Sequence, residues 1–249
     1  MIDAPARTNR FAVQLSLPFR SNQQLGLRHF VPFDCAPVTW LRQILDASGI
    51  AGKGLLVGPS GCGKTHLLAA TCQQASRLGL SVAYVPLAEA QSLAPDILLG
   101  LEAHDLICID DLQCVAGMPA WEQALFHCYN ACDASATRLV FAARNTPAKL
   151  RIGLPDLVSR LSATLIWQLP VLSDVQLSQA ISLRAAAASF NLPQPVADYL
   201  LRRFPRDMQR LAALTDRLGE LSLREHRRVT VPAVREWLEA GDLAVSSQP

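Results

Sequence analysis

The sequence contains no uninterrupted apolar run that could cross a membrane. Its longest apolar runs, such as residues 55–57 and 106–109, have the length of strands, whereas a membrane-spanning helix needs about 20 apolar residues. The first 17 residues mix charged and polar side chains and lack the continuous apolar core of a secretory signal peptide. We therefore expect a cytoplasmic protein without membrane contact.

A large excess of charge is also missing. The chain has 23 Lys and Arg residues against 21 Asp and Glu residues, for a net charge of +2. Proteins that bind mainly through nucleic-acid phosphates usually carry a strong basic excess, so a dominant nucleic-acid surface is not expected. Half of the 249 residues are hydrophobic and 18% are charged, which excludes a disordered chain.

The sequence also lacks closely spaced pairs of cysteines. The seven cysteines form no C-x-x-C pair, the spacing that would indicate a zinc site or a redox couple. Since disulfides are rare in the cytosol, we interpret these cysteines as small core residues.

What is present is an alternation of strands and helices, followed by helices only. The strand-length apolar runs are residues 54–57, 81–85, 105–109, 138–142 and 164–169. Amphipathic segments such as 64–77 and 119–132 lie between them, and this alternation predicts an α/β domain with a five-stranded parallel sheet covered by helices on both faces. After Pro170 four helical segments follow, which predict a small second domain; they are residues 174–190, 195–203, 206–218 and 231–240.

These patterns divide the chain into four parts. Residues 1–30 lack sustained periodicity and read as a flexible N-terminal arm. The α/β domain is expected over residues 31–170 and the helical domain over residues 171–241, with a tail at residues 242–249.

A phosphate-binding loop is predicted between the first strand and the helix after it. The pattern G-x-x-x-x-G-K-[ST] is formed there by Gly58, Pro59, Ser60, Gly61, Cys62, Gly63, Lys64 and Thr65. In such loops the glycines let backbone N–H groups approach phosphate oxygens, Lys64 contacts the β- and γ-phosphates, and the Thr65 hydroxyl binds Mg²⁺. The alternative is a plain glycine turn. The pattern favours ADP or ATP with Mg²⁺ as the ligand.

Two acids end the third apolar run. In a nucleotide-hydrolysing site Asp110 would bind Mg²⁺, and Asp111 would orient or deprotonate the attacking water. The alternative is that both acids begin a loop or cap the next helix. Together with the phosphate loop, the pair favours the catalytic interpretation for Asp110. For Asp111 both interpretations stay open, because many ATPases of this type carry the longer Glu at that position.

Two further stretches give the chain a family resemblance. Residues 121–130, WEQALFHCYN, and residues 153–161, GLPDLVSRL, make the sequence resemble the DnaA/Hda family of AAA+ ATPases, and within it the regulatory Hda branch. The resemblance runs from about residue 29 to residue 238. It implies an AAA+ nucleotide-binding domain followed by a helical lid domain.

The resemblance assigns roles to several arginines and one asparagine. Arg160 matches the arginine finger, which acts on a nucleotide bound to a neighbouring molecule; the alternative is a surface ion pair with Asp156. Arg206, or failing that Arg210, matches the lid arginine that touches the nucleotide. Asn145 lies in the γ-phosphate sensor, but Arg144 stands where the family has an acid, which implies weak hydrolysis of the resident nucleotide and a chain that holds ADP.

The arm carries a second resemblance, to the peptide by which Hda proteins bind the β sliding clamp of DNA polymerase III. It covers Gln14, Leu15, Leu17, Pro18 and Phe19. The alternatives are a strand or an apolar patch without function. The chain ends just after the helical segment 231–240, so the DNA-reading module of the initiator, and with it sequence-specific DNA binding, is not expected.

Together these features predict a negative regulator of DNA replication initiation. Docked on the DNA-loaded clamp, it would use Arg160 to stimulate hydrolysis of the ATP bound to the initiator DnaA, and it could also assemble with further copies of itself. One alternative is an AAA+ ATPase of the helicase-loader type, stimulated by DNA. Another is a targeting adaptor that needs no nucleotide.

Overall fold

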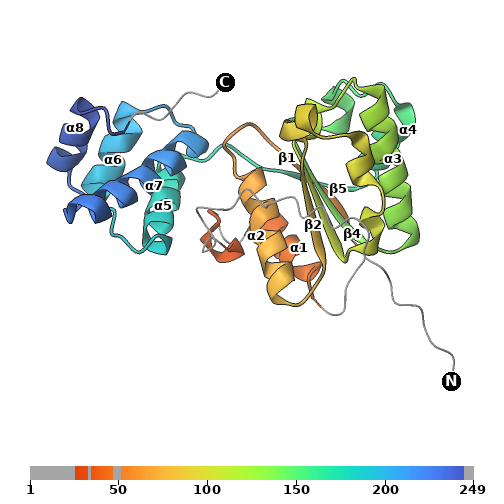
Figure 1. Cartoon of the computed structure of the whole chain (residues 1–249), viewed down its shortest axis with the longest axis horizontal. Coiled ribbons are helices and arrows are strands. Elements are labelled where there is room, and N and C mark those ends of the chain that lie inside the picture. The colour runs from red at the N-terminus through yellow and green to blue at the C-terminus, as the bar shows by residue number, and fades with distance from the viewer. Residues whose placement is uncertain (1–25, 33–34, 47–51, 244–249) are drawn as a thin grey trace.

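The computed structural model describes residues 26–32, 35–46 and 52–243, which form a sheet-containing domain and a helical domain (Figure 1). The sheet has five parallel strands in the order β2-β3-β4-β1-β5. The strands are β1 (Lys53–Val57), β2 (Val82–Pro86), β3 (Leu106–Asp110), β4 (Arg138–Ala143) and β5 (Leu165–Gln168). Each bound lies within one residue of the predicted run, and the predicted five-stranded parallel sheet is confirmed.

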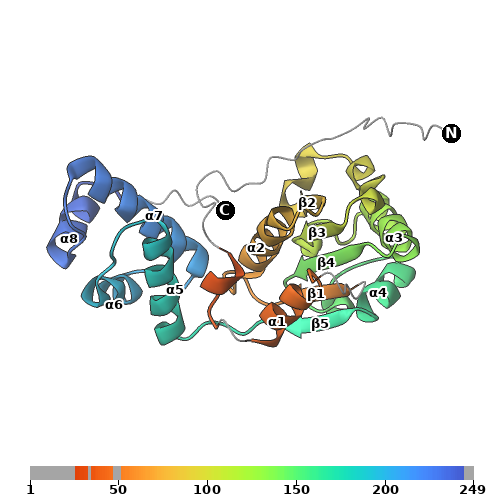
Figure 2. The same ribbon diagram turned by 90° about the horizontal axis from the view of Figure 1, so that it is seen from below.

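Helices cover the sheet on both faces (Figure 2). Helices α1 (Ala36–Gln43) and α2 (Lys64–Arg77) lie on one face, and α3 (Pro119–Ala134) and α4 (Pro155–Ser162) lie on the other. Leu55 and Leu56, neighbours in β1, belong to the cores on opposite faces, because successive side chains of a strand point to opposite sides. Because the central strands are buried on both faces, their sequences are nearly continuous apolar runs.

Burial differs between the centre and the edge of the sheet. All five residues of β3 are buried, whereas Leu165 and Ile166 of the edge strand β5 are 53% and 39% exposed. The connection between β2 and β3 is a series of short 3-10 turns, η2 (Leu87–Ser92), η3 (Pro95–Leu98) and η4 (Leu101–Ala103).

The second domain consists of four helices, as predicted for the lid. They are α5 (Asp174–Ala187), α6 (Gln194–Arg203), α7 (Met208–Glu225) and α8 (Val231–Glu239). Ser173 caps α5, since its Oγ accepts a hydrogen bond from the N–H of Gln176 while the Gln176 side chain accepts one from the N–H of Ser173. These helices share one apolar core.

The predicted end of one lid helix is wrong. The segment 206–218 was expected to stop at Gly219, but α7 continues to Glu225. A Cβ atom on residue 219 would lie 2.7 Å from Cε1 of Phe190. The glycine therefore permits a close contact with Phe190 and does not end the helix.

The last residues assigned to the N-terminal arm pack against the α/β domain. Leu27 and Phe30 are buried, and residues 27–29 form the 3-10 turn η1 (Leu27–His29). Within the described ranges no helix combines the length and the apolar character needed to cross a membrane. The seven cysteines are all free and five of them are buried, while Cys114 is exposed.

Candidate nucleotide site

Three of the predicted site segments meet at the carboxyl end of the sheet. Val57, which ends β1, pairs with Ala143, which ends β4, and β3 lies on the other side of β4. The phosphate loop follows β1, the two acids end β3, and Asn145 follows β4, where it is exposed. Open α/β sheets bind ligands at this carboxyl edge, so the topology brings the three predicted segments together.

The phosphate loop requires its glycines. Gly61 and Gly63 have φ angles of 77° and 94°, which other residues rarely adopt. A Cβ atom on Gly58 would lie 2.7 Å from both the Cys62 sulfur and the carbonyl oxygen of Leu169. The loop then runs directly into α2, whose first backbone N–H groups face the loop as a potential anion site.

Lys64 is folded back onto this loop. Its side chain is buried, and Nζ donates hydrogen bonds to the carbonyl oxygens of Gly58 at 2.7 Å and Pro59 at 2.8 Å. A buried ammonium group needs such acceptors. To contact a phosphate, the ammonium group has to exchange at least one of these carbonyls for a phosphate oxygen.

Asp110 is fixed by three different segments. The residue is 1% exposed; Tyr84 Oη donates to its Oδ2 at 3.0 Å, and the N–H of Asp111 donates to its Oδ1 at 2.9 Å. The Thr65 hydroxyl also hydrogen-bonds to its carboxylate. Burial raises the pKa of Asp110, and the hydrogen bond from Thr65 partly offsets this rise. A buried carboxylate bonded to the threonine of the loop is the oxygen donor set that Mg²⁺ prefers beside a nucleotide.

Asp111 has a partner that connects β3 to β4. Its backbone is left-handed, with a φ of 59°, and its Oδ1 accepts a hydrogen bond from Nε2 of Gln113 at 2.6 Å. The Oε1 of Gln113 in turn accepts from the N–H of Arg144 at 3.0 Å. Gln113 therefore joins the end of the acidic strand to the predicted sensor segment.

The lid contacts the phosphate loop through the start of α7. A Cβ atom on Gly61 would lie 3.1 Å from Oδ1 of Asp207. The neighbouring Arg206 is bound to Asp174, with Nε to Oδ1 at 2.5 Å and Nη2 to Oδ2 at 2.9 Å. Arg206 is therefore next to the loop but engaged with the lid, and Arg210 is exposed one turn further along α7.

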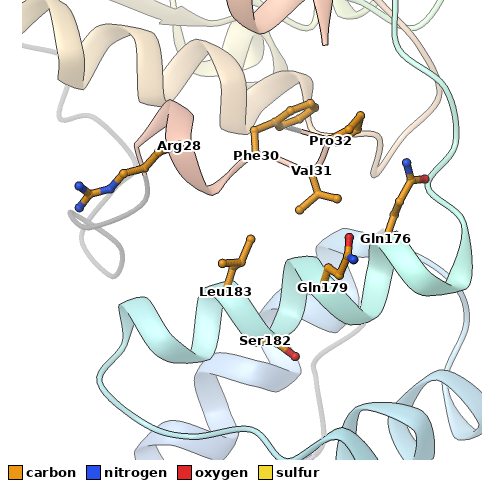
Figure 3. A pocket seen from close by; sticks show the side chains of 8 residues that line it. All are labelled: Arg28, Phe30, Val31, Pro32, Gln176, Gln179, Ser182 and Leu183. Carbon is orange, nitrogen blue, oxygen red and sulfur yellow. The ribbon is translucent and has the colours of Figure 1, made fainter. Parts of the chain in front are cut away.

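A cavity of about 640 Å³ lies between residues 28–32 and α5 (Figure 3). Val31 and Leu183 extend into it from opposite sides, Phe30 lines it from the side away from α5, and Gln176 and Gln179 line it from α5. Phe30 also packs against the phosphate loop, since a Cβ atom on Gly63 would lie 2.6 Å from Cε2 of its ring. Phe30 thus connects the wall of this cavity to the phosphate loop.

His66, which follows the loop threonine, contributes no positive charge here at neutral pH. Its ring stacks on Phe30 with a centroid separation of 6.1 Å. Burial, together with the charges of Arg184 and His29, lowers the pKa of His66 to about 4. Lys64 is therefore the cation of the loop.

Arg160 lies apart from these groups. It belongs to α4, which packs on the face of the sheet opposite to α2. The Arg160 side chain is exposed, and its Cζ atom lies 5.8 Å from the centroid of the Tyr129 ring. Among the described residues no ion pair joins it to Asp156.

Four residues of the site were not identified from the sequence: Tyr84, Gln113, Glu122 and Asp174. Tyr84 faces Asp110 only because β2 pairs with β3 in a register that aligns Tyr84 with Cys108, which the sequence does not specify. Glu122 did carry a signal, since it precedes Leu125 by one helical turn on an apolar face. Its carboxylate is buried between α3 and α4.

Two family models match the chain. The model of the bacterial DnaA ATPase domain matches residues 42–168, and the model of the Hda lid domain matches residues 174–238. The two matches meet near the boundary between the sheet domain and the helical domain.

Solved structures share the fold at low identity. The replication initiator DnaA bound to AMPPCP and single-stranded DNA is 21% identical with a TM-score of 0.66, over 82% of this chain and 69% of that chain. Domain III of the Thermotoga maritima replication initiation protein DnaA is 19% identical with a TM-score of 0.70, over 85% and 94%. The Thermotoga maritima RuvB Holliday junction branch migration motor is 18% identical with a TM-score of 0.59, over 83% and 68%.

The family matches cover both described domains, and the structural matches add the common arrangement of sheet and helices. The chain belongs to the DnaA family of AAA+ ATPases and carries a lid domain of the Hda type.

Proposed function

We propose that this protein is a nucleotide-bound negative regulator of replication initiation, which stimulates hydrolysis of the ATP bound to DnaA. The observation that carries the proposal is the placement of Arg160 away from the phosphate loop, on the opposite face of the sheet. The phosphate loop, Asp110 and the start of the lid form a nucleotide site, whereas Arg160 is exposed on α4 outside that site.

The resident nucleotide is ADP or ATP. The backbone N–H groups of the loop and Lys64 bind its phosphates, while the base and ribose occupy the cavity between residues 28–32 and α5. Thr65 and Asp110 hold the accompanying Mg²⁺, which neutralises phosphate charge when bound. Arg206 contacts the phosphates after it leaves Asp174, with Arg210 as the second candidate for this contact.

Hydrolysis of this resident nucleotide is slow. Asp111 would have to orient water, but Gln113 holds its carboxylate at 2.6 Å. At the sensor position Arg144 replaces an acid and leaves Asn145 alone to face the γ-phosphate. Both features favour a chain that keeps its nucleotide and uses it to stabilise the folded state.

Arg160 acts on the neighbouring initiator. A guanidinium group placed against the γ-phosphate neutralises the charge that develops in the transition state, an effect of about 10³- to 10⁵-fold in related systems. Its exposure on α4 leaves it available for contact between molecules. The partners proposed are therefore DnaA and, through a similar contact, further copies of this chain.

The β sliding clamp is the proposed docking site of this protein. Gln14, Leu15, Leu17, Pro18 and Phe19 lie outside the described residues, and their proposed role rests on their resemblance to a clamp-binding peptide. Such a peptide docks as an extended segment, with Leu17 and Phe19 filling an apolar pocket.

The deciding experiment is single-turnover hydrolysis of ATP prebound to DnaA, with clamp loaded on DNA. Wild-type protein should accelerate hydrolysis and Arg160→Ala should not. Arg202→Ala, which removes an exposed arginine of the lid, is the matched control and should behave like wild type. No acceleration by the wild type would reject the proposal.

Three further measurements test the docking step and separate the alternatives. Leu17→Ala with Phe19→Ala should abolish clamp binding and stimulation together; retained stimulation would contradict the docking step. A helicase-loader function predicts robust multiple-turnover hydrolysis stimulated by single-stranded DNA. An adaptor function predicts that Lys64→Ala leaves regulation intact.

A further inference from the structure

Glu122 is a buried carboxylate, and its hydrogen-bond partners among the described residues are all backbone N–H groups. It is 3% exposed in the first turn of α3. Its oxygens accept hydrogen bonds from the N–H groups of Gly117 at 2.7 Å, Gly153 at 3.0 Å and Leu154 at 2.9 Å. No ion pair in the described part of the chain involves this side chain. Because a buried carboxylate is costly unless its oxygens are satisfied, these three bonds fix the local backbone.

Two of the three bonds act on the start of α4. Leu154 is the N-cap residue of this helix, and its own side chain provides no cap. The Glu122 carboxylate accepts from the last N–H groups before the helix and places a negative charge at its positive end. A residue of α3 therefore performs the capping that α4 lacks.

The same helix contacts the other end of α4. Tyr129 follows Glu122 by two turns along α3, and its ring lies under Arg160, 5.8 Å from the guanidinium carbon. The two contacts lie just before the first residue of α4 and in its last turn. Helix α3 thus sets both the start of α4 and the direction of its arginine.

We propose that Glu122 is a positioning residue for Arg160. This inference rests on the proposed function of Arg160 in hydrolysis of a partner's ATP. Glu122 does not touch that nucleotide; it holds α4 so that the guanidinium group reaches the phosphate in one orientation. A displacement of about 1 Å in such a group can cost about 100-fold in rate.

The test compares Glu122→Gln with Glu239→Gln, which makes the same charge change at an exposed site of α8. Glutamine conserves the volume but turns an NH₂ group toward backbone N–H donors. In the single-turnover assay we expect Glu122→Gln to lower the maximal rate by about 10- to 100-fold. The concentration that gives half of this rate should stay unchanged, because Glu122 is buried and the docking surfaces are intact. Glu239→Gln should match wild type.

Hydrogen exchange provides a readout independent of activity. In Glu122→Gln the amides of residues 153–162 should exchange faster, while those of α8 should not change. If Glu122→Gln fails to fold, Glu122→Asp, which keeps the charge with shorter reach, takes its place with the same expectations. If the Glu122 variant keeps the wild-type maximal rate while Arg160→Ala still fails to stimulate hydrolysis, the inference about Glu122 is overturned. The proposed function of Arg160 then still stands. A wild-type protein without stimulation would instead overturn the proposed function.

Discussion

Single side chains in this protein are held by partners that the sequence does not place beside them. Asp110 is bound by Tyr84 of a neighbouring strand, and Arg206 by Asp174 across the lid. The pair of Arg206 and Asp174 matters for nucleotide binding, because the Asp174 carboxylate and a phosphate of the nucleotide would compete for the Arg206 guanidinium group. The bidentate bond to Asp174 raises the pKa of Arg206, so the arginine stays charged.

Asp174→Asn should therefore strengthen nucleotide binding. An exposed ion pair is weak, so we expect an increase in ADP affinity of at most about fivefold, measured by isothermal titration calorimetry. Asp156→Asn makes the same charge change at an exposed site of α4 and should leave the affinity unchanged. Since the effect runs through Arg206, Asp174→Asn should change nothing in an Arg206→Ala background. Equal or weaker binding by the single variant would mean that Arg206 does not reach the nucleotide.

At the scale of elements, composition and periodicity predict that a helix or a strand exists, and which of the two it is, better than they predict where it ends. The runs that became β1, β3 and β4 are recognisable because burial on both faces leaves charged residues only at the strand ends. The end of α7 was misjudged because a glycine can serve packing as well as termination. The partners of Glu122 and Tyr84 depend on the register and on contacts between elements, which no local pattern contains.

The contact of Gly219 with Phe190 predicts a specific cost. Gly219→Val should lower the free energy of unfolding by about 1–3 kcal/mol, because a Cβ atom 2.7 Å from Phe190 Cε1 overpacks the lid core. Urea denaturation measures this change. Leu223→Val introduces the same side chain at an exposed position of α7 and should have little effect. In a Phe190→Ala background the cost of Gly219→Val should shrink; full additivity would refute the packing explanation.

The junction of α7 and α8 predicts a pH dependence. Trp237 Nε1 donates to Oε2 of Glu225 at 2.8 Å. This hydrogen bond, with Arg224 and Arg227 nearby, lowers the pKa of Glu225. A depressed folded-state pKa stabilises the protein above the ordinary pKa of a glutamate, and the stabilisation is lost as pH falls through the folded-state pKa.

Glu225→Gln should therefore be less stable than wild type at pH 7, with a difference that disappears at a pH below the folded-state pKa. Urea denaturation at several pH values gives this difference. Glu239→Gln, at an exposed site of the neighbouring helix, should show no comparable pH-dependent gap. A gap that persists unchanged in acid would show that ionisation of Glu225 is not its cause.

In the whole molecule the proposed nucleotide site combines two domains. The sheet domain supplies the phosphate loop and Asp110, and the lid supplies the start of α7 and one wall of the cavity. The sequence indicated the phosphate half, because that chemistry requires fixed residue types at fixed spacing. It did not indicate the cavity, which forms where residues 28–32 face α5, more than 140 positions later in the chain.

This division predicts that base binding and phosphate binding can be separated. Leu183→Trp should fill the cavity opposite Val31 and weaken ADP binding by about tenfold or more. Inorganic triphosphate, which needs only the loop, should bind as it does to wild type. Leu223→Trp adds the same bulk on an exposed face of α7 and should leave both ligands unaffected. Competition of each ligand against a fluorescent ADP analogue gives the two affinities. Unchanged ADP binding by Leu183→Trp would place the base outside this cavity, whereas weakening of both ligands would mean that the lid wall also shapes the phosphate loop through Phe30.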